Sequence, residues 1–121
     1  MVIEGEVIFP KGTKPISGAT LIATLQDTRE ADAPARIVRK HMLPSVSHDP
    51  ARSRSLPFSL EYDAPASLGL TVSVLVDLDG DGRTSPGDFI NMESYRVKSE
   101  VNRQKVRVRV FRVPFHEGKS K

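Results

Sequence analysis

Apolar and polar residues alternate with a period of two along most of this chain, which is the pattern of β-strands that bury one face. Nine prolines and eight glycines divide the chain into short runs, and no stretch keeps a helical period over three turns. The alternating runs span residues 2–9, 19–26, 35–43, 56–62, 70–76, 89–97 and 106–110. We therefore predict an all-β, single-domain antiparallel β-sandwich of about seven strands. The domain is expected to take up residues 1–115, and residues 116–121 are expected to form a flexible tail.

The same alternation predicts which side chains face the core. On this basis we expect the following residues to be buried: Leu21, Leu25, Phe58, Leu60, Val72, Val74, Val106 and Val108. The alternation slips at Val110 and Phe111, two consecutive apolar residues, and this predicts a bulge or a change of phase near the end of the last strand.

Composition excludes several classes of chemistry. The chain has no cysteine, so disulfides, thiolate catalysis and cysteine metal sites are ruled out. Its 18 Lys and Arg against 15 Asp and Glu give a net charge of +3, a small excess that does not favour nucleic acid as a partner. No apolar run approaches the roughly 20 residues of a membrane-spanning helix. The first residues, MVIEGEVIF, lack the charged and apolar regions of a signal peptide, so none is expected.

Two segments carry a family resemblance, Leu25–Ala35 (LQDTREADAPA) and Pro57–Asp63 (PFSLEYD), within a match from Gly5 to about Val97. In these segments the chain resembles the YbaY-like and YscW-like small lipoproteins. The resemblance implies a compact β-sandwich, a location in the periplasm or at the outer membrane, and the role of some members as pilotins or chaperones for type III secretion. The lipid-bearing cysteine of that family has no counterpart here, and the acidic segment VDLDGDGRTSPGD is not a general family feature.

That acidic segment is the strongest chemical signal in the sequence. Its spacing matches the twelve-residue calcium loop, in which a hard cation collects oxygen ligands from alternate positions. The candidate ligands are the carboxylates of Asp77, Asp79, Asp81 and Asp88 and the carbonyl of Arg83, with Gly82 at the sharp bend. Asp replaces Glu at the last position, and a strand rather than a helix precedes the loop. The spacing favours Ca²⁺ as a bound ion, and an acidic turn between two strands is the alternative.

The other candidate sites give weaker evidence for a function. His41, His48 and His116 have no metal-ligand spacing, and nucleophile, P-loop and dinucleotide motifs are missing, so we expect no enzyme activity. The basic stripe from Arg103 to Arg112 is expected to be a solvated strand face.

The resulting hypothesis is a non-enzymatic protein that binds a protein partner, by resemblance to secretion-associated lipoproteins, and carries a calcium-binding loop at residues 77–88. The alternative is a structural module of the cell envelope with an ion-stabilised loop and no dedicated partner.

Overall fold

The computed structural model is all-β, as predicted, and it describes residues 2–27, 36–49, 52, 55–62, 69–80, 82–98 and 102–114. Within these residues the chain forms eight strands: β1 (Val2–Ile8), β2 (Ile16–Asp27), β3 (Arg36–His48), β4 (Ser55–Glu61), β5 (Leu70–Asp77), β6 (Phe89–Asn91), β7 (Tyr95–Arg96) and β8 (Arg103–Arg112). The predicted tail at 116–121 lies outside the described residues. No helix of membrane-spanning length and hydropathy occurs among the residues described.

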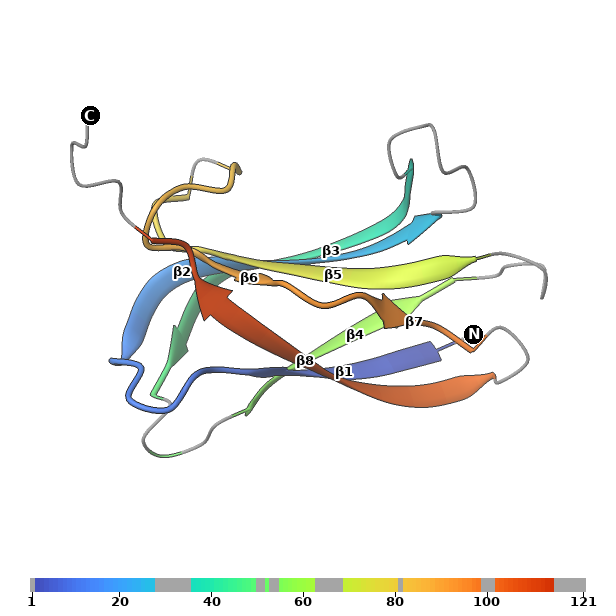
Figure 1. Ribbon diagram of the computed structural model, residues 1–121, viewed down its shortest axis with the longest axis horizontal. Coiled ribbons are helices and arrows are strands. Elements are labelled where there is room, and N and C mark those ends of the chain that lie inside the picture. The colour runs from blue at the N-terminus through green and yellow to red at the C-terminus, as the bar shows by residue number, and fades with distance from the viewer. Residues whose placement is uncertain are drawn as a thin grey trace.

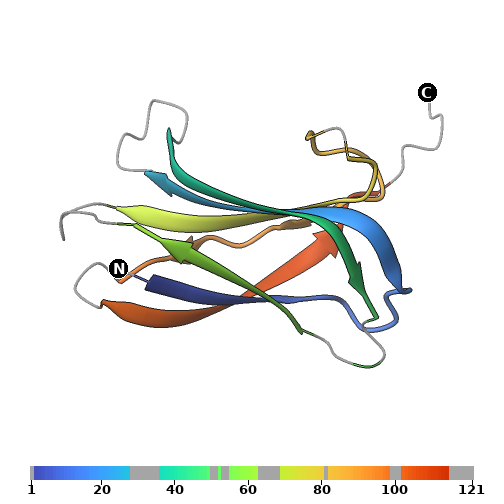
Figure 2. The ribbon, with the colours of Figure 1, turned by 180° about the vertical axis from the view of Figure 1, so that it is seen from behind.

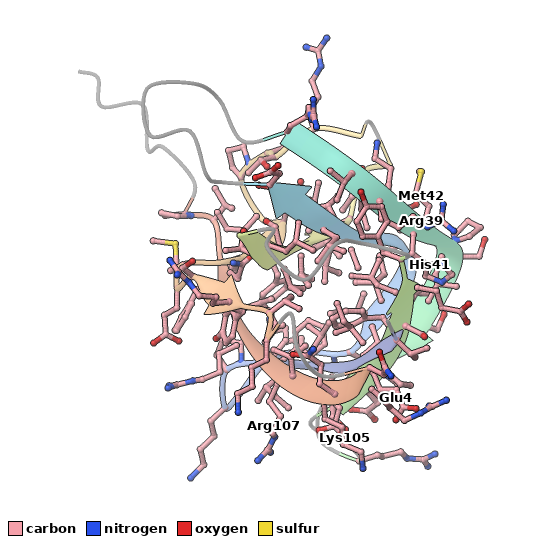
Figure 3. The ribbon with its side chains drawn as sticks, turned by 90° about the vertical axis from the view of Figure 1, so that its right-hand side faces the viewer. Glu4, Arg39, His41, Met42, Lys105 and Arg107 are labelled. Carbon is pink, nitrogen blue, oxygen red and sulfur yellow. The ribbon has the colours of Figure 1, made fainter. Side chains whose placement is uncertain are left out.

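The strands form one strongly curved sheet with the order β3-β2-β5-β6-β8-β1-β4, and β7 pairs with β5 beside β6. The sheet folds into two layers, β3-β2-β5-β6 and β8-β1-β4, which face each other across the core (Figures 1 and 2). Pairing is antiparallel except between β1 and β8, which run parallel. Viewed end-on, the layers enclose the core as a nearly closed barrel, with the edge strands β3 and β4 on either side of its seam (Figure 3).

The core consists of the inward-facing residues of both layers, as the alternation predicted. Of the eight residues expected to be buried, seven are less than 9% exposed, and Val106 is partly buried against them. Phe58 lies opposite Gly5, and a Cβ atom at position 5 would stand 2.0 Å from its ring. Glycine at this position therefore lets the ring of Phe58 lie over the β1 backbone.

The long strand β8 joins the two layers because it changes partner along its length. Residues up to Arg109 pair with β1, and residues from Val110 pair with β6. At the change of partner, the backbone N–H of Arg109 donates to the hydroxyl of Tyr95 (2.8 Å), which in turn donates to the Glu93 carboxylate (3.0 Å). Burial raises the pKa of the Tyr95 phenol, the Arg109 N–H opposes this rise, and Glu93 adds to it.

Besides the parallel β1–β8 pair, the structure differs from the prediction at three places. Residues 89–97 form two short strands rather than one, because the Asn91 side chain accepts from the N–H of Val74 (2.8 Å) where the main chain leaves the ladder. Strand β3 continues past Leu43, and the β2–β3 register shifts next to Ser45, whose φ is 56°. No register shift occurs at Val110 and Phe111; Val110 faces the core and Phe111 faces outward.

Candidate functional site

The acidic loop connects β5 to β6 and is anchored at both ends. It begins at Asp77, the last residue of β5, and ends at Asp88, immediately before β6. Two backbone hydrogen bonds tie its end to the strand end of β8: the Gly87 N–H donates to the Val113 carbonyl (2.8 Å), and the Val113 N–H donates to the Asp88 carbonyl (2.7 Å).

Asp77 and Asp88 are buried carboxylates that organise this loop from within. Each is 1% exposed. Asp77 accepts from the N–H of Gly80 (2.9 Å) with one oxygen and from the N–H of Gly82 (2.7 Å) with the other. Asp88 accepts from the N–H of Leu78 (2.8 Å) and of Ser85 (2.9 Å) in the same way. All four carboxylate oxygens therefore accept from backbone donors that the loop leaves without a sheet partner.

These contacts decide the charge state of Asp77. Burial alone would raise the pKa of its carboxyl, but a hydrogen bond with the Asp79 side chain and bonds from the backbone of Gly82, Gly80 and Asp79 together outweigh it. The pKa of Asp77 consequently lies below its ordinary value. The carboxylate is thus ionised at neutral pH, as both a cation site and a self-bonded turn require.

The structure brings three of the five predicted ligands together. One carboxylate oxygen from each of Asp77, Asp79 and Asp88 lies within 4.8 Å of the others. Asp81 falls outside the described residues. The carbonyl of Arg83 accepts a long hydrogen bond from the Ser85 hydroxyl (3.4 Å). The trio offers the oxygen ligands that Ca²⁺ prefers, and the backbone hydrogen bonds to Asp77 and Asp88 also suffice to hold an acidic turn without an ion.

A feature that the sequence analysis missed lies on the outer face of the β3-β2-β5-β6 layer. Cross-strand register aligns one apolar residue from each successive strand in a single row that ends on β8. This outer apolar row consists of Met42, Ile22, Leu75, Ile90 and Phe111. Ile22 is covered by its neighbours, whereas Met42 and Phe111 at the two ends remain exposed. The signal in the sequence was weak: Leu21–Ile22 and Val74–Val76 are unbroken apolar runs within strands that otherwise alternate.

The surroundings of the row are basic. Lys40, Arg96 and Arg109 are exposed on the outer side of these strands, and none of them forms an ion pair within the described part of the chain. At the β8 end, Met92 and Phe111 line a shallow depression of about 580 Å³. This face combines exposed apolar side chains with unpaired positive charge.

The other layer has a different outer face. Its basic side chains lie opposite acidic residues of β1, so that Arg103 pairs with Glu4, and Arg107 approaches Glu6 at 3.6 Å. The predicted solvated face is therefore correct for this half of the basic stripe. Lys105 lies opposite Glu4 in register, and Figure 3 shows Glu4, Lys105 and Arg107 pointing outward from the same side of the barrel.

The histidines do not gather into a site within the described residues. His41 lies on β3, and His48 ends that strand with its ring stacked on Phe9, the two ring centroids being 5.3 Å apart. His116 lies outside the described residues. Among the residues described, the acidic trio is the one group of three or more His, Asp or Glu side chains close enough to share an ion.

Comparison with known proteins finds one informative likeness. No protein-family model matches the chain, and no curated protein sequence matches it. The fold is similar to that of an alternative pilotin from the type II secretion system of Vibrio cholerae, with a TM-score of 0.67 and 25% sequence identity. The likeness covers 92% of this chain and 96% of the pilotin chain, so the two proteins share a whole domain. This chain has a pilotin-like fold, and the similar structure comes from a type II system, whereas the sequence had suggested a type III family.

Proposed function

We propose that this chain is a non-enzymatic protein of the bacterial cell envelope that binds a subunit of a secretion system, in the manner of a pilotin. The observation that carries the proposal is the likeness to the Vibrio cholerae pilotin over nearly the full length of both chains. The fold alone would not carry it, since one fold hosts many functions. The specific YbaY-like or YscW-like type III assignment remains a hypothesis from the sequence, without a family match to support it.

The described surface is consistent with a binding role. Exposed apolar residues that gather on one face are typical of protein interaction sites, and the outer apolar row with Met92 and Ile37 is such a gathering. Within the described residues no nucleophile, base and orienting group lie together as acyl or phosphoryl transfer would need. A calcium ion in the acidic loop would have a supporting role, because it would stabilise the connection between β5 and β6.

Deletion of the gene in its own host tests the proposal. We expect less assembled secretion channel in the outer-membrane fraction and less secreted protein in the medium, both restored by the gene in trans. A photo-crosslinking amino acid placed at Met42 on one outer face, or at Lys105 on the other, should capture the same secretion subunit from at least one position. Unchanged secretion and channel assembly in the deletion strain would instead favour a structural envelope module with no dedicated partner.

A further inference from the structure

The two strands at the seam of the barrel are unequal edges. Strand β4 pairs only with β1, and at its centre it carries Pro57, which has no N–H to donate to another strand. Strand β3 pairs only with β2; its register shifts at Val38, and from Arg39 to Leu43 it forms a regular edge up to the irregularity at Pro44 and Ser45. Among the described residues, no backbone hydrogen bond joins β3 to any strand other than β2. Its outward N–H and C=O groups are therefore the more available ones.

The side chains along this edge are basic and apolar. Strand β3 contains Arg36, Arg39 and Lys40 and no acidic residue. On the outer face, register places Ile37, Lys40 and Met42 in succession, opposite Gln26, Thr24 and Ile22 of β2. Ile37 and Met42 are 52% and 51% exposed. Apolar, cationic and apolar positions thus follow one another along the strand.

Arg39 and His41 lie on the seam side of the same edge. They are opposite Leu25 and Ala23 in register, and Figure 3 shows both labels beside Met42 on this flank of the barrel. The Arg39 guanidinium donates to the Glu61 carbonyl of β4 (2.8 Å), so that a side chain rather than a strand bridges the seam at this point. Positive charge is therefore present on both faces of the edge.

From the open edge and its charge we propose that β3 is the docking edge for an extended, acidic segment of the partner protein, which adds to the sheet as a further strand. This proposal rests on the proposed function and specifies its partner surface. Main-chain hydrogen bonds to the edge would supply affinity, as in other cases of strand addition. The partner segment would place apolar side chains beside Ile37 and Met42 and carboxylates beside Lys40 and Arg39.

The positive charge of β3 also disfavours a second copy of this chain as the strand that pairs with the edge. A second copy of β3 would bring cations directly opposite cations, which is unfavourable across paired strands. Basic residues on an edge strand commonly prevent such self-pairing, and here they leave an acidic strand as the complementary occupant. The β8 end of the outer apolar row lacks this combination, because Glu93 lines the depression there and would repel an acidic strand.

A synthetic peptide of alternating valine and glutamate, about nine residues long to span residues 36–43, tests the proposal on the ¹⁵N-labelled full chain. The matched peptides replace glutamate by lysine, or carry N-methyl groups on all backbone amides. We expect the Glu/Val peptide to shift the amide resonances of residues 36–43 and to slow their hydrogen exchange. The Lys/Val and N-methylated peptides should bind at least about tenfold more weakly, the equivalent of about 1.4 kcal/mol.

The protein variants isolate the charge of the edge. The double variant Arg39→Glu with Lys40→Glu should weaken binding of the Glu/Val peptide by about tenfold or more and should strengthen binding of the Lys/Val peptide. The control variant Arg96→Glu with Arg109→Glu, on β7 and β8, changes the net charge by the same amount as the first double variant. It should alter the affinity for the Glu/Val peptide by less than about twofold. Lys40→Glu alone, at an exposed side chain, provides the test if loss of the Arg39–Glu61 contact perturbs folding. No binding of the Glu/Val peptide, equal binding of its N-methylated form, or equal loss in the two double variants would overturn the proposal.

Experiments in the host separate this proposal from the general one. If a crosslinker at Met42 captures the secretion subunit, one at Lys105 does not, and Lys40→Glu lowers capture, the edge is the partner site. If secretion depends on the protein but capture occurs only from Lys105, the pilotin-like function stands and the β3 edge is the wrong surface. If the peptide binds at β3 while deletion leaves secretion unchanged, the edge binds acidic strands but the proposed function is wrong.

Discussion

The two layers of this barrel have outer faces of opposite character. In the β8-β1-β4 layer, a transverse row across the strands reads Lys105, Glu4 and Ser59, all polar, and Glu4 pairs with Arg103. In the β3-β2-β5-β6 layer, the outer apolar row crosses every strand, and Lys40, Arg96 and Arg109 beside it form no ion pair among the described residues. On the first face, Arg103 and Arg107 pair with Glu4 and Glu6 of β1. The second face leaves apolar side chains and unpaired cations exposed, as on a surface that another molecule covers.

Core and outer face of the same layer should respond very differently to one substitution. Val74→Asp places a charge among buried residues and is expected to cost more than about 4 kcal/mol, enough to unfold the domain or nearly so. Met42→Asp makes the same exchange of an apolar residue for Asp on the outer apolar row and should change stability by less than about 0.5 kcal/mol. Urea unfolding followed by far-UV circular dichroism measures both. A large loss of stability from Met42→Asp would mean that the exposed row is needed for folding and is not reserved for binding.

The acidic loop closes the end of the more exposed layer, and Asp77 should dominate its stability. Asp77→Asn leaves one of the two backbone N–H groups, of Gly80 or Gly82, facing an amide donor, at a cost of about 1–3 kcal/mol at pH 7. Because the folded pKa of Asp77 is lowered, its ionisation stabilises the fold above the unfolded pKa, and this contribution is lost as the pH falls through the folded pKa. The difference between wild type and Asp77→Asn should thus shrink below about pH 4. Asp79→Asn, at an exposed side chain, is the control and should cost less; an equal cost would contradict the internal bonding described for Asp77.

The alternation of apolar and polar residues predicted the core because the inward face of a strand can be read from its own sequence, whichever strands lie beside it. Leu21, Leu60 and Val74 could be placed inward from their own strands alone, and the spacing of Asp77, Asp79 and Asp88 predicted that they meet. The outer apolar row could not be predicted in this way, since it runs across strands and appears only when the register of each pair is known. The parallel pairing of β1 with β8 could not be predicted either, because these strands lie at opposite ends of the chain and only the complete fold makes them neighbours.

Calcium distinguishes the two interpretations of the acidic loop. If the loop binds Ca²⁺ with a Kd of about 10⁻⁵–10⁻³ M, as extracellular modules do, millimolar calcium should stabilise the folded state by about 1.4 kcal/mol for a Kd near 10⁻⁴ M. A thermal melt with calcium and with chelator measures the shift, and Mg²⁺ should produce a smaller one. Asp79→Asn with Asp81→Asn should remove the shift and leave the barrel folded. A midpoint indifferent to calcium in the unmutated protein would identify the loop as an acidic turn.

The junction between the layers depends on one hydroxyl. Tyr95→Phe leaves the Arg109 N–H without its acceptor at the point where β8 changes partner, and should cost about 1 kcal/mol. Tyr62, the other tyrosine, packs partly buried against the core and provides the matched control, because Tyr62→Phe removes a hydroxyl away from that junction. Hydrogen exchange should show faster opening at Arg109 in the first variant only. Equal effects of the two substitutions would mean that the Tyr95 hydroxyl does not hold the junction.

The smallest expected effect tests the contrast in charge between the two outer faces. Glu4 pairs with Arg103 and lies opposite Lys105, so Glu4→Gln should lower stability by about 0.2–1 kcal/mol at low salt, a modest value because both partners are exposed. Lys40 has no ion-pair partner among the described residues, and Lys40→Gln removes a cation beside Arg39; it should leave stability unchanged or raise it slightly. Repeating the urea unfolding in 1 M NaCl should erase the loss caused by Glu4→Gln, because screening at that ionic strength acts within about 3 Å. A salt-sensitive loss from Lys40→Gln as large as that from Glu4→Gln would show that the basic edge is satisfied within the protein itself, and the charge that should attract an acidic strand would then be already neutralised.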